Sequence, residues 1–386
     1  MVLALIVLCF WIAAAMLAVI NLVAIPRLRR AARREDGPLV SVVIPARDEE
    51  QAIERTLLAF LAQDHPNLEV ILVDDESADR TGAIARELEA RDPRVRVIDG
   101  APPPPGWLGK PWAQHQGAEA ARGSLLLFVD ADITYAPGAV AAAVDELERS
   151  GAGLLAFLPK VEMHGFWERV LMPQLSVAAF AMLPSFLANL VRSPKLAIGG
   201  GTGILMRRPV YAEAGGHAAL RNAVIDDVSL ARLAARVAPF RLVLADDFVS
   251  VRLYHGLGEI VRGFTKNFYF VLGARVPVAL AILAGNALLH LAPWGYAAAA
   301  GATWLAGGTP DPAHIAGLSA LAFLHLTRLT VYIPLRYGIS NALLAHLPMT
   351  AVWTWIALRS VWIVGFRREL VWRGRSYDAR LGRFGA

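Results

Sequence analysis

Hydrophobic and polar positions divide the chain into an apolar start, a long mixed stretch and an apolar end. Residues 1–26, MVLALIVLCFWIAAAMLAVINLVAIP, carry no charge, and a helix needs about 20 apolar residues to cross a bilayer core. Five arginines follow between residues 27 and 34. This order favours a retained membrane anchor over a cleaved signal peptide, whose positive charges come first. The positive-inside rule then places the following domain in the cytoplasm.

The mixed stretch, residues 36–270, alternates short apolar runs with segments of helical spacing. The predicted strands are residues 39–46, 68–77, 95–99 and 124–132, and the predicted helices between them are residues 49–63, 78–91 and 108–121. Strands that alternate with helices predict an α/β fold with a parallel sheet covered on both faces. In such sheets ligands bind at the carboxyl ends of the strands.

One segment inside this domain is unusually apolar. Residues 165–191, GFWERVLMPQLSVAAFAMLPSFLANLV, are interrupted by Pro173 and Pro184, which makes the segment a poor spanning helix. Two interpretations remain: a hairpin in the membrane interface that admits a lipid, or a purely structural hydrophobic hairpin.

The chain becomes apolar again over residues 271–366. We expect about four spans there, at residues 276–291, 295–306, 315–334 and 343–365, with a tight turn at APWG between the first two. Five arginines lie between residues 359 and 375, so the basic tail, residues 367–386, is also expected in the cytoplasm. A chain that enters and leaves this bundle on the same side needs an even number of spans. We therefore expect a multi-pass protein of the inner (cell) membrane.

Composition narrows the class further. The chain is 56% hydrophobic with a formal net charge of +5, and the excess basic residues cluster beside apolar runs. We interpret this basicity as membrane-flanking and expect the lipid bilayer, with no nucleic acid, as a partner. The single cysteine, Cys9, excludes an intramolecular disulfide and a thiolate zinc cluster.

Two predicted strands end in acids. Asp130 and Asp132 follow the apolar run of residues 125–129, and Asp74 and Asp75 follow an earlier strand. Unpaired carboxylates are costly to bury, and Mg²⁺ or Mn²⁺ prefers carboxylate oxygens and shares its shell with substrate phosphates. A solvated turn would explain either pair alone. Two acidic strand ends in one sheet indicate a single pocket for a nucleotide and its metal.

Several motifs together resemble a known family. SVVIPARDEE, VILVDDESADRT, GKPWAQHQG, LLLFVDADI and IDDVSLA stand in the order and spacing of family 2 glycosyltransferases of the GT-A fold, over residues 40 to about 270. PPPGWLGKPWA, IGGGTGILMRR and WRGRSY carry a closer likeness to hopene-associated glycosyltransferases. Ceramide glucosyltransferase and carotenoid glycosyltransferases are more distantly similar. The resemblance implies a nucleotide-diphospho-sugar transferase domain, Rossmann-like with a mostly parallel sheet, joined to α-helical transmembrane segments.

The resemblance also implies roles for individual residues on the donor side. The expected donor-binding residues are Ala46, Arg47 and Glu49 at the uracil and ribose, Asp75 on the uracil with Asp74 beside it, Lys110 on the diphosphate, and Asp130 on the sugar or the metal shell. Asp132 is expected to bind the metal. Relatives read ARNEE where this chain reads ARDEE, so Asp48 adds a charge whose role stays open. Helix capping with Ser77 is the alternative for Asp74 and Asp75, and an exposed surface lysine is the alternative for Lys110.

The catalytic base is expected at Asp227. Asp226 and Asp227 open a predicted helix, where acids are stabilised by about 0.3–1 kcal/mol. By resemblance the second acid takes the proton of an acceptor hydroxyl as that oxygen attacks the anomeric carbon, which inverts the anomeric configuration. Asp226 is expected to provide local charge or to contact the diphosphate or the acceptor.

The chain departs from part of the family pattern. Processive synthases carry Gln-x-x-Arg-Trp after the base, and this chain instead has RGFTKNFYF, with Arg262, Lys266 and Asn267. These residues are expected either to contact the diphosphate or acceptor, or to form an interfacial helix that touches lipid phosphate.

The resulting functional hypothesis is an inverting glycosyltransferase. It moves a sugar from a nucleotide-diphosphate donor, expected to be a UDP-sugar, to a hydroxyl of a membrane lipid acceptor such as a hopanoid or another isoprenoid. The alternatives are a processive polysaccharide synthase, disfavoured by the missing motif, and an inactive membrane scaffold, disfavoured by the complete set of acids.

Overall fold

The computed structural model describes residues 1–31, 36–372 and 375–378, and it divides the chain into two compact units. The helical unit consists of Met1–Ala24, Met163–Phe186 and Tyr254–Leu370. The α/β unit consists of Ile25–Glu162, Leu187–Leu253 and the described residues from Val371 on. Arg33 and Arg34 of the predicted basic cluster lie outside the described residues, as do residues 373–374 and 379–386 of the predicted tail.

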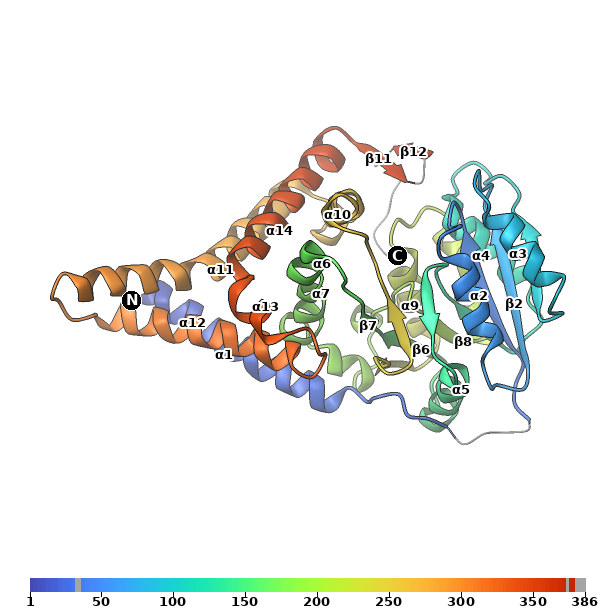
Figure 1. Cartoon of the computed structure of the whole chain (residues 1–386), viewed down its shortest axis with the longest axis horizontal. Coiled ribbons are helices and arrows are strands. Elements are labelled where there is room, and N and C mark those ends of the chain that lie inside the picture. Colours follow the sequence, from blue (N-terminus) through green and yellow to red (C-terminus); the bar gives the residue numbers. More distant parts are fainter. Residues whose placement is uncertain (32–35, 373–374, 379–386) are drawn as a thin grey trace. The chain divides into compact units, whose positions relative to one another are not determined.

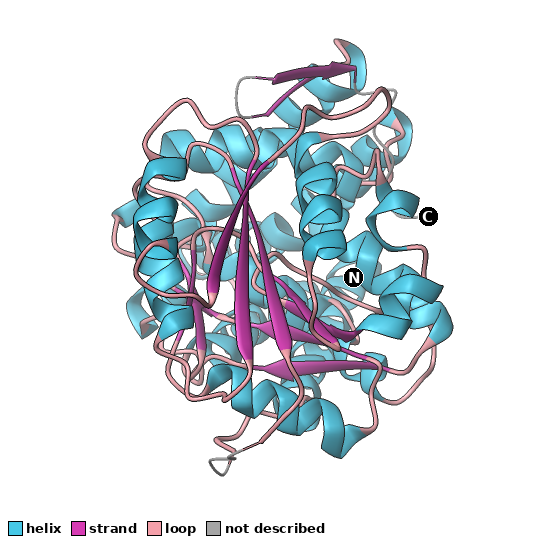
Figure 2. Ribbon diagram, turned by 90° about the vertical axis from the view of Figure 1, so that its right-hand side faces the viewer, coloured by secondary structure: helices cyan, strands magenta, loops and turns pink. Residues whose placement is uncertain are grey.

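A seven-stranded, mostly parallel sheet forms the centre of the α/β unit, in the order β3-β2-β1-β4-β8-β6-β9. The strands are β1 Val40–Ala46, β2 Leu68–Asp74, β3 Val95–Asp99, β4 Leu125–Phe128, β6 Leu154–Leu158, β8 Ile204–Arg207 and β9 Phe240–Leu244. Neighbouring strands are parallel except where β8 pairs with β4 and β6. The strands run side by side among helices in Figure 2. The predicted α/β class and the predicted strands are confirmed, although β4 ends at Phe128, before the acids.

Helices cover both faces of this sheet because its strands are apolar on both sides. The helices and helical turns are α2 Ile53–Leu61, α3 Thr81–Glu89, α4 Gly109–Ala120, α5 Ala139–Ser150, α8 Arg208–Glu213, α9 Asp226–Val237, η3 Pro194–Leu196 and η4 Gly216–Leu220. One core packs α2, α3 and α5 against one face, and a second core packs α4 and α9 against the other. A small second sheet joins β5 Ile133–Tyr135, β10 Val249–Val251 and β7 Lys160–Val161.

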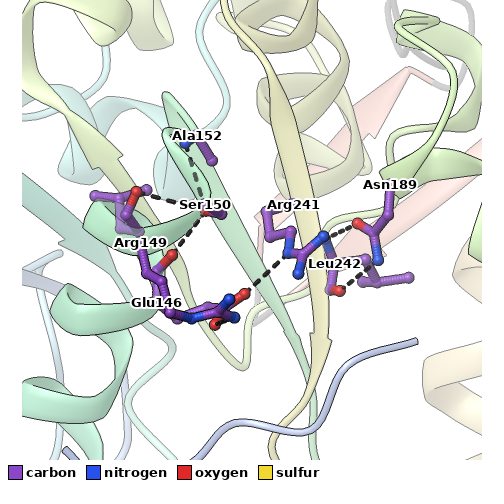
Figure 3. Close-up of polar contacts among 8 residues, drawn as sticks. Glu146, Arg149, Ser150, Ala152, Asn189, Arg241 and Leu242 are labelled. Atoms are coloured by element: carbon purple, nitrogen blue, oxygen red, sulfur yellow. Dashed lines mark hydrogen bonds and ion pairs between the residues drawn. The ribbon is translucent and has the colours of Figure 1, made fainter. Parts of the chain in front are cut away.

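The edge strand β9 is closed by side-chain contacts. The Asn189 amide donates to the carbonyl of Leu242 at 2.9 Å and accepts from its N–H at 2.7 Å, and Arg241 Nε donates to Glu146 at 2.9 Å (Figure 3). Pro26 and Leu28 exchange backbone hydrogen bonds with Leu244. These contacts use polar groups that an open sheet edge leaves free.

The helical unit contains four helices long and apolar enough to cross a membrane: Val2–Ala24, Val276–Leu305, Pro312–Tyr332 and His346–Phe366. They correspond to α1, α11, α12 and α14 (His346–Ser360) extended by the π-helical turn η5 (Val361–Phe366) (Figure 1). The helical unit also contains α6 Phe166–Leu171, α7 Pro173–Val177, η1 Ala178–Met182, α10 Leu257–Val271 and α13 Ile339–Leu344. The elements η2 Ser185–Asn189 and β11 Glu369–Trp372 lie where the chain passes between the units, and the short strand β12 Arg375–Asp378 belongs to the α/β unit.

The expected turn at APWG is wrong, because α11 runs through it as one helix of 30 residues. Pro293 has no N–H, so the carbonyl of Leu289, four residues earlier, loses its helical partner. The indole of Trp11 donates to this carbonyl at 2.9 Å. A freed backbone group in a membrane helix is tolerated when a neighbouring helix satisfies it. The described residues therefore contain three C-terminal helices of spanning length, in place of the four expected.

Most of the apolar segment of residues 165–191 belongs to the helical unit, and not to the α/β domain in which the sequence analysis placed it. Residues 163–186 group with the helical unit and form short helices separated near Pro173 and Pro184. Asn21 of α1 donates to the carbonyls of Phe180 and Leu183 at 2.7 and 2.8 Å, and accepts from the N–H of Phe186 at 2.8 Å. One polar side chain of the anchor thus satisfies the backbone groups that the break at Pro184 leaves open.

Candidate active site

The carboxyl ends of β1, β2 and β4 meet at one edge of the sheet because these strands are parallel neighbours. Ala46 and Asp74 are register partners at the ends of β1 and β2. Asp75 follows β2 directly, and Asp130 and Asp132 lie in the loop after β4, which ends at Phe128.

The first group of residues joins the loops after β1 and β2. The N–H of Asp75 donates to the carbonyl of Ala46 at 2.8 Å. Arg47 Nη1 donates to the carbonyl of Asp75 at 2.6 Å and lies 4.0 Å from its carboxylate. Asp75 is 3% exposed. The structure therefore brings together three of the residues expected at the nucleotide, Ala46, Arg47 and Asp75.

The neighbouring acids hold backbone N–H groups. Asp74 Oδ1 accepts from the N–H of Ser77 at 3.0 Å, and Asp48 Oδ1 accepts from the N–H of Ala78 at 2.8 Å. Glu49 contributes its own N–H to Thr81 Oγ1 at 2.7 Å. Because α3 begins only at Thr81, Ser77 is not its N-cap, and its hydroxyl instead accepts from the N–H of Asp48 at 3.1 Å. Asp48, whose role was open, thus links the two loops.

The second group surrounds Lys110. Its Nζ lies 2.7 Å from Asp130 Oδ1 and 3.4 Å from Asp226 Oδ2. Lys110 stands in the first turn of α4 and its side chain is 17% exposed, so it is not the freely exposed lysine of the alternative interpretation. Burial alone would lower the pKa of Lys110, but the charges of Asp130, Asp226 and Asp227 raise it well above its usual value.

The two acids of α9 share this environment. Asp226 and Asp227 form the first turn of α9, and the N–H of Val228 donates to Asp227 Oδ1 at 2.7 Å. Burial is the main cause that raises the pKa of Asp227 to about 7; the charges of Asp226 and Asp130 add to it and Lys110 opposes it. Burial also raises the pKa of Asp226, while Lys110 lowers it. A carboxyl group with a pKa near neutrality is suited to general base chemistry.

The remaining expected residues lie less centrally. Asp132 follows Asp130 in the loop between β4 and β5, where its carbonyl accepts from Arg55 Nη2 at 3.5 Å. Arg262, Lys266 and Asn267 lie on α10 of the helical unit. Their contact with a diphosphate or an acceptor stays a prediction.

Sequence reasoning missed the ion pairs that join three distant motifs. It gave Asp226 a helix-start charge or a contact with the diphosphate or the acceptor, whereas the carboxylate lies beside Lys110, far earlier in the chain. No periodicity or spacing signals a contact between the first turns of two helices that are so far apart in the sequence. The structure thereby brings Lys110, Asp130 and Asp226 together, with Asp227 electrostatically coupled to them.

Comparisons with known proteins bear on the fold and on the enzyme class. Residues 41–215 match Glycosyl transferase family 2. A 4,4'-diaponeurosporenoate glycosyltransferase of Staphylococcus aureus (strain MRSA252) is 27% identical over 351 residues, 88% of each chain. A protein of the same name from Staphylococcus haemolyticus (strain JCSC1435) is 29% identical over 232 residues; this match covers 59% of the chain and 60% of that relative, less than two thirds of its length.

Among solved structures, a mannosyltransferase from Pyrobaculum calidifontis, in complex with GDP-Man and Mn²⁺, is similar over 95% of this chain and 99% of its own. The TM-score is 0.55 at 21% identity, which shows a shared fold. The family match and the named relatives confirm the predicted enzyme class. Residues 41–215 therefore match a family 2 glycosyltransferase domain, and the solved neighbour confirms the predicted fold.

Proposed function

We propose that the protein transfers a sugar from a nucleoside diphosphate sugar to a hydroxyl group of a membrane lipid, with inversion of the anomeric centre. One observation carries this proposal: Lys110, with a largely covered side chain, lies beside a carboxylate of the loop after β4 and a carboxylate of α9, next to an aspartate whose pKa is about 7. A lysine at the start of a helix can bind a diphosphate, and an aspartate of that pKa can remove a proton near neutral pH.

The donor site is proposed at the first group of residues. Ala46, Arg47 and Asp75 lie together at the ends of β1 and β2, and Glu49 and Asp74 lie in the same pair of loops. We propose UDP as the nucleotide because the sequence resemblance points to it. The fold neighbour was solved with GDP-Man, so GDP is the comparison that the experiment must include.

The metal is proposed at Asp132, with Asp130 as a second carboxylate. No group of three or more His, Cys, Asp or Glu side chains suited to a metal occurs within residues 1–31, 36–372 and 375–378. Mg²⁺ or Mn²⁺ bound by one or two carboxylates and by substrate phosphates fits this donor set. When bound, such an ion would offset negative charge on the departing diphosphate.

The protein's own residues have separate roles in the proposed transfer reaction. Lys110 binds the diphosphate, and Asp227 accepts the proton of the acceptor hydroxyl. Asp226 keeps the pKa of Asp227 high through its like charge. Arg262, Lys266 and Asn267 of α10 are proposed to contact either the diphosphate or lipid phosphate.

A membrane lipid is proposed as the acceptor because the chain carries four helices able to span a membrane. Large apolar side chains on them, such as Val2, Ile6 and Val23 of α1, are exposed, which suits contact with lipid. The relatives are named for 4,4'-diaponeurosporenoate. An isoprenoid acceptor, hopanoid or carotenoid-like, is therefore the first to test.

The proposed location is the inner membrane, with the α/β unit in the cytoplasm. Arginines 27, 29 and 30 directly follow α1, as the positive-inside rule requires. A cytoplasmic tail would need one of the three C-terminal helices not to cross the membrane. Reporter fusions at Asp99 and after Gly365 decide this: opposite signals would mean that all three helices cross, and a periplasmic signal at Asp99 would contradict the proposed location.

The deciding experiment is a donor panel. The purified protein is incubated with UDP- and GDP-sugars, with and without Mn²⁺, and membrane lipids from cells with and without the gene are analysed by mass spectrometry. We expect metal-dependent donor hydrolysis and one lipid heavier by a hexose in cells with the gene. If no nucleotide raises the melting temperature and no lipid changes, the protein is an inactive scaffold.

A further inference from the structure

Two of three consecutive glycines, Gly199 and Gly201, border the group of residues around Lys110, and Gly200 lies between them. The carbonyl of Gly201 accepts from the N–H of Asp130 at 2.8 Å. A Cβ atom placed on Gly201 would overlap the Asp130 carboxylate. A Cβ atom on Gly199 would overlap the carbonyl oxygen of Asp227. The glycines therefore touch the aspartate beside Lys110 on one side and the first turn of α9 on the other.

The middle glycine has no such neighbour. A Cβ atom on Gly200 would approach Thr202 Oγ1 at 3.5 Å, an ordinary van der Waals contact. None of the three glycines has the positive φ that disfavours other residues. Space, and not backbone conformation, is thus the reason for glycine at positions 199 and 201.

The loop cannot withdraw easily because its next residue is fixed on both sides. The hydroxyl of Tyr135 donates to the carbonyl of Thr202 at 2.8 Å, and Thr202 Oγ1 donates to the carbonyl of Phe157 at 3.1 Å. All these groups are buried. An added methyl group must therefore displace the active-site residue and not the loop.

We propose that Gly199 and Gly201 are positioning residues of the transfer reaction, a role that rests on the proposed function of Asp130 and Asp227. Gly201 leaves the space in which the Asp130 carboxylate pairs with Lys110. Gly199 sets the place of the first turn of α9, which carries Asp227.

Alanine substitutions at Gly201 and Gly199 should impair donor binding and transfer differently. In Gly201→Ala the displaced atoms are the end of a flexible side chain, so the fold is kept while the pair with Lys110 is lost. Loss of such a charge-assisted contact predicts donor affinity lower by about 10- to 100-fold. In Gly199→Ala the obstacle is backbone, so the start of α9 must shift. A displacement of about 1 Å costs about 100-fold in rate, and it should appear in kcat with little change in donor affinity.

Gly200→Ala is the matched control, with the same change one residue away. UDP and GDP are titrated with Mn²⁺ against the full-length protein and the three variants, and transfer is measured in parallel. We expect Gly200→Ala to behave as the wild type. If Gly200→Ala loses as much donor affinity or transfer rate as the other two variants, any alanine in this loop is disruptive, and the proposal is wrong.

A readout without nucleotide separates this proposal from the proposed function. Melting temperatures of Lys110→Met, Asp130→Asn and the double variant give the coupling between the two side chains. The coupling should be present in the wild-type background and absent in the Gly201→Ala background. If it persists there, Gly201 does not position Asp130, whatever the donor experiments show. If the coupling behaves as expected but no nucleotide binds the wild type, the geometric part of the inference holds and the proposed function fails.

Discussion

Two of the strand ends in the α/β unit that carry aspartates, those of β2 and β4, differ in their surroundings. After β2, Asp74 accepts a backbone N–H and Asp75 lies beside Arg47 in a network of loop contacts. After β4, Asp130 lies beside Lys110 together with Asp226 of α9. The first pair resembles ordinary loop support, and the second belongs to a crowded charge cluster in which the pKa of Asp227 reaches about 7.

An acidic strand end therefore does not by itself reveal whether its carboxylates hold a loop together or belong to a cluster of charged groups. Carboxylates bonded to backbone N–H groups are stabilised in their charged form. Burial, followed by like charge nearby, raises the pKa of Asp226 and of Asp227 at the second place. By our proposal, similar sequence patterns thus give a loop of the donor-binding site in one place and the reacting groups in the other.

The largest effect is expected at Asp227. Asp227→Asn keeps the size of the side chain and removes its basicity, so transfer should fall by about 10²–10⁴. The donor KM should change little, since the lost interaction belongs to the transition state. Steady-state kinetics with the donor found by the panel measures both. A variant that transfers normally would remove Asp227 from the mechanism.

The Asp132→Asn variant tests whether the carboxylate of Asp132, in the loop after β4, binds the metal. An amide is a poor replacement for a carboxylate on a hard cation, so Mn²⁺ should no longer enhance nucleotide binding. Calorimetry with UDP and with GDP, with and without Mn²⁺, gives the answer. Unchanged metal dependence would show that the metal is bound elsewhere.

Lys110→Met tests the charge cluster through stability. Removing the cation leaves the buried carboxylate of Asp226 without its ion-pair partner. Water compensates the loss only partly for Asp130, whose side chain is 35% exposed. We expect a loss of about 2 kcal/mol, below the value of about 3–5 for a fully buried pair. A thermal melt should show a decrease of about 4–8 °C for a unit of this size. Lys160→Met, at an exposed position of β7, is the control and should melt as the wild type does.

Asp74→Ala should have the smallest effect of these substitutions. It removes one hydrogen bond to the N–H of Ser77, worth about 1 kcal/mol, and the melting temperature should fall by about 2–4 °C. Transfer should decrease far less than in Asp227→Asn. A loss of transfer as large as in Asp227→Asn would contradict the different roles that we propose for the two strand ends.

Much of the fold could be predicted because it depends on local pattern. The apolar runs of β1, β2 and β4, and the helical spacing of α2 and α9, are visible in the sequence. Strand adjacency follows from the alternation of strands and helices, which places the acids after β2 and β4 at one edge.

Other features could not be predicted because they depend on distant partners. The helix α11 continues through Pro293 because Trp11 donates to the carbonyl of Leu289. Residues 163–186 join the helical unit, where Asn21 satisfies their backbone. The approach of Lys110 to Asp226 likewise becomes visible only in three dimensions.

The pH dependence of transfer by the wild-type protein tests the central claim most directly. Asp227 must be deprotonated to accept a proton, and its pKa is raised to about 7. The basic form is therefore lost as the pH falls through 7, and kcat/KM should decrease about tenfold per unit below that value. In Asp226→Asn the like charge that raises the pKa of Asp227 is gone, so the decrease should begin at a lower pH. A wild-type profile that stays flat from pH 8 to pH 5 would contradict the assignment of Asp227 as the base in a crowded, buried carboxylate cluster.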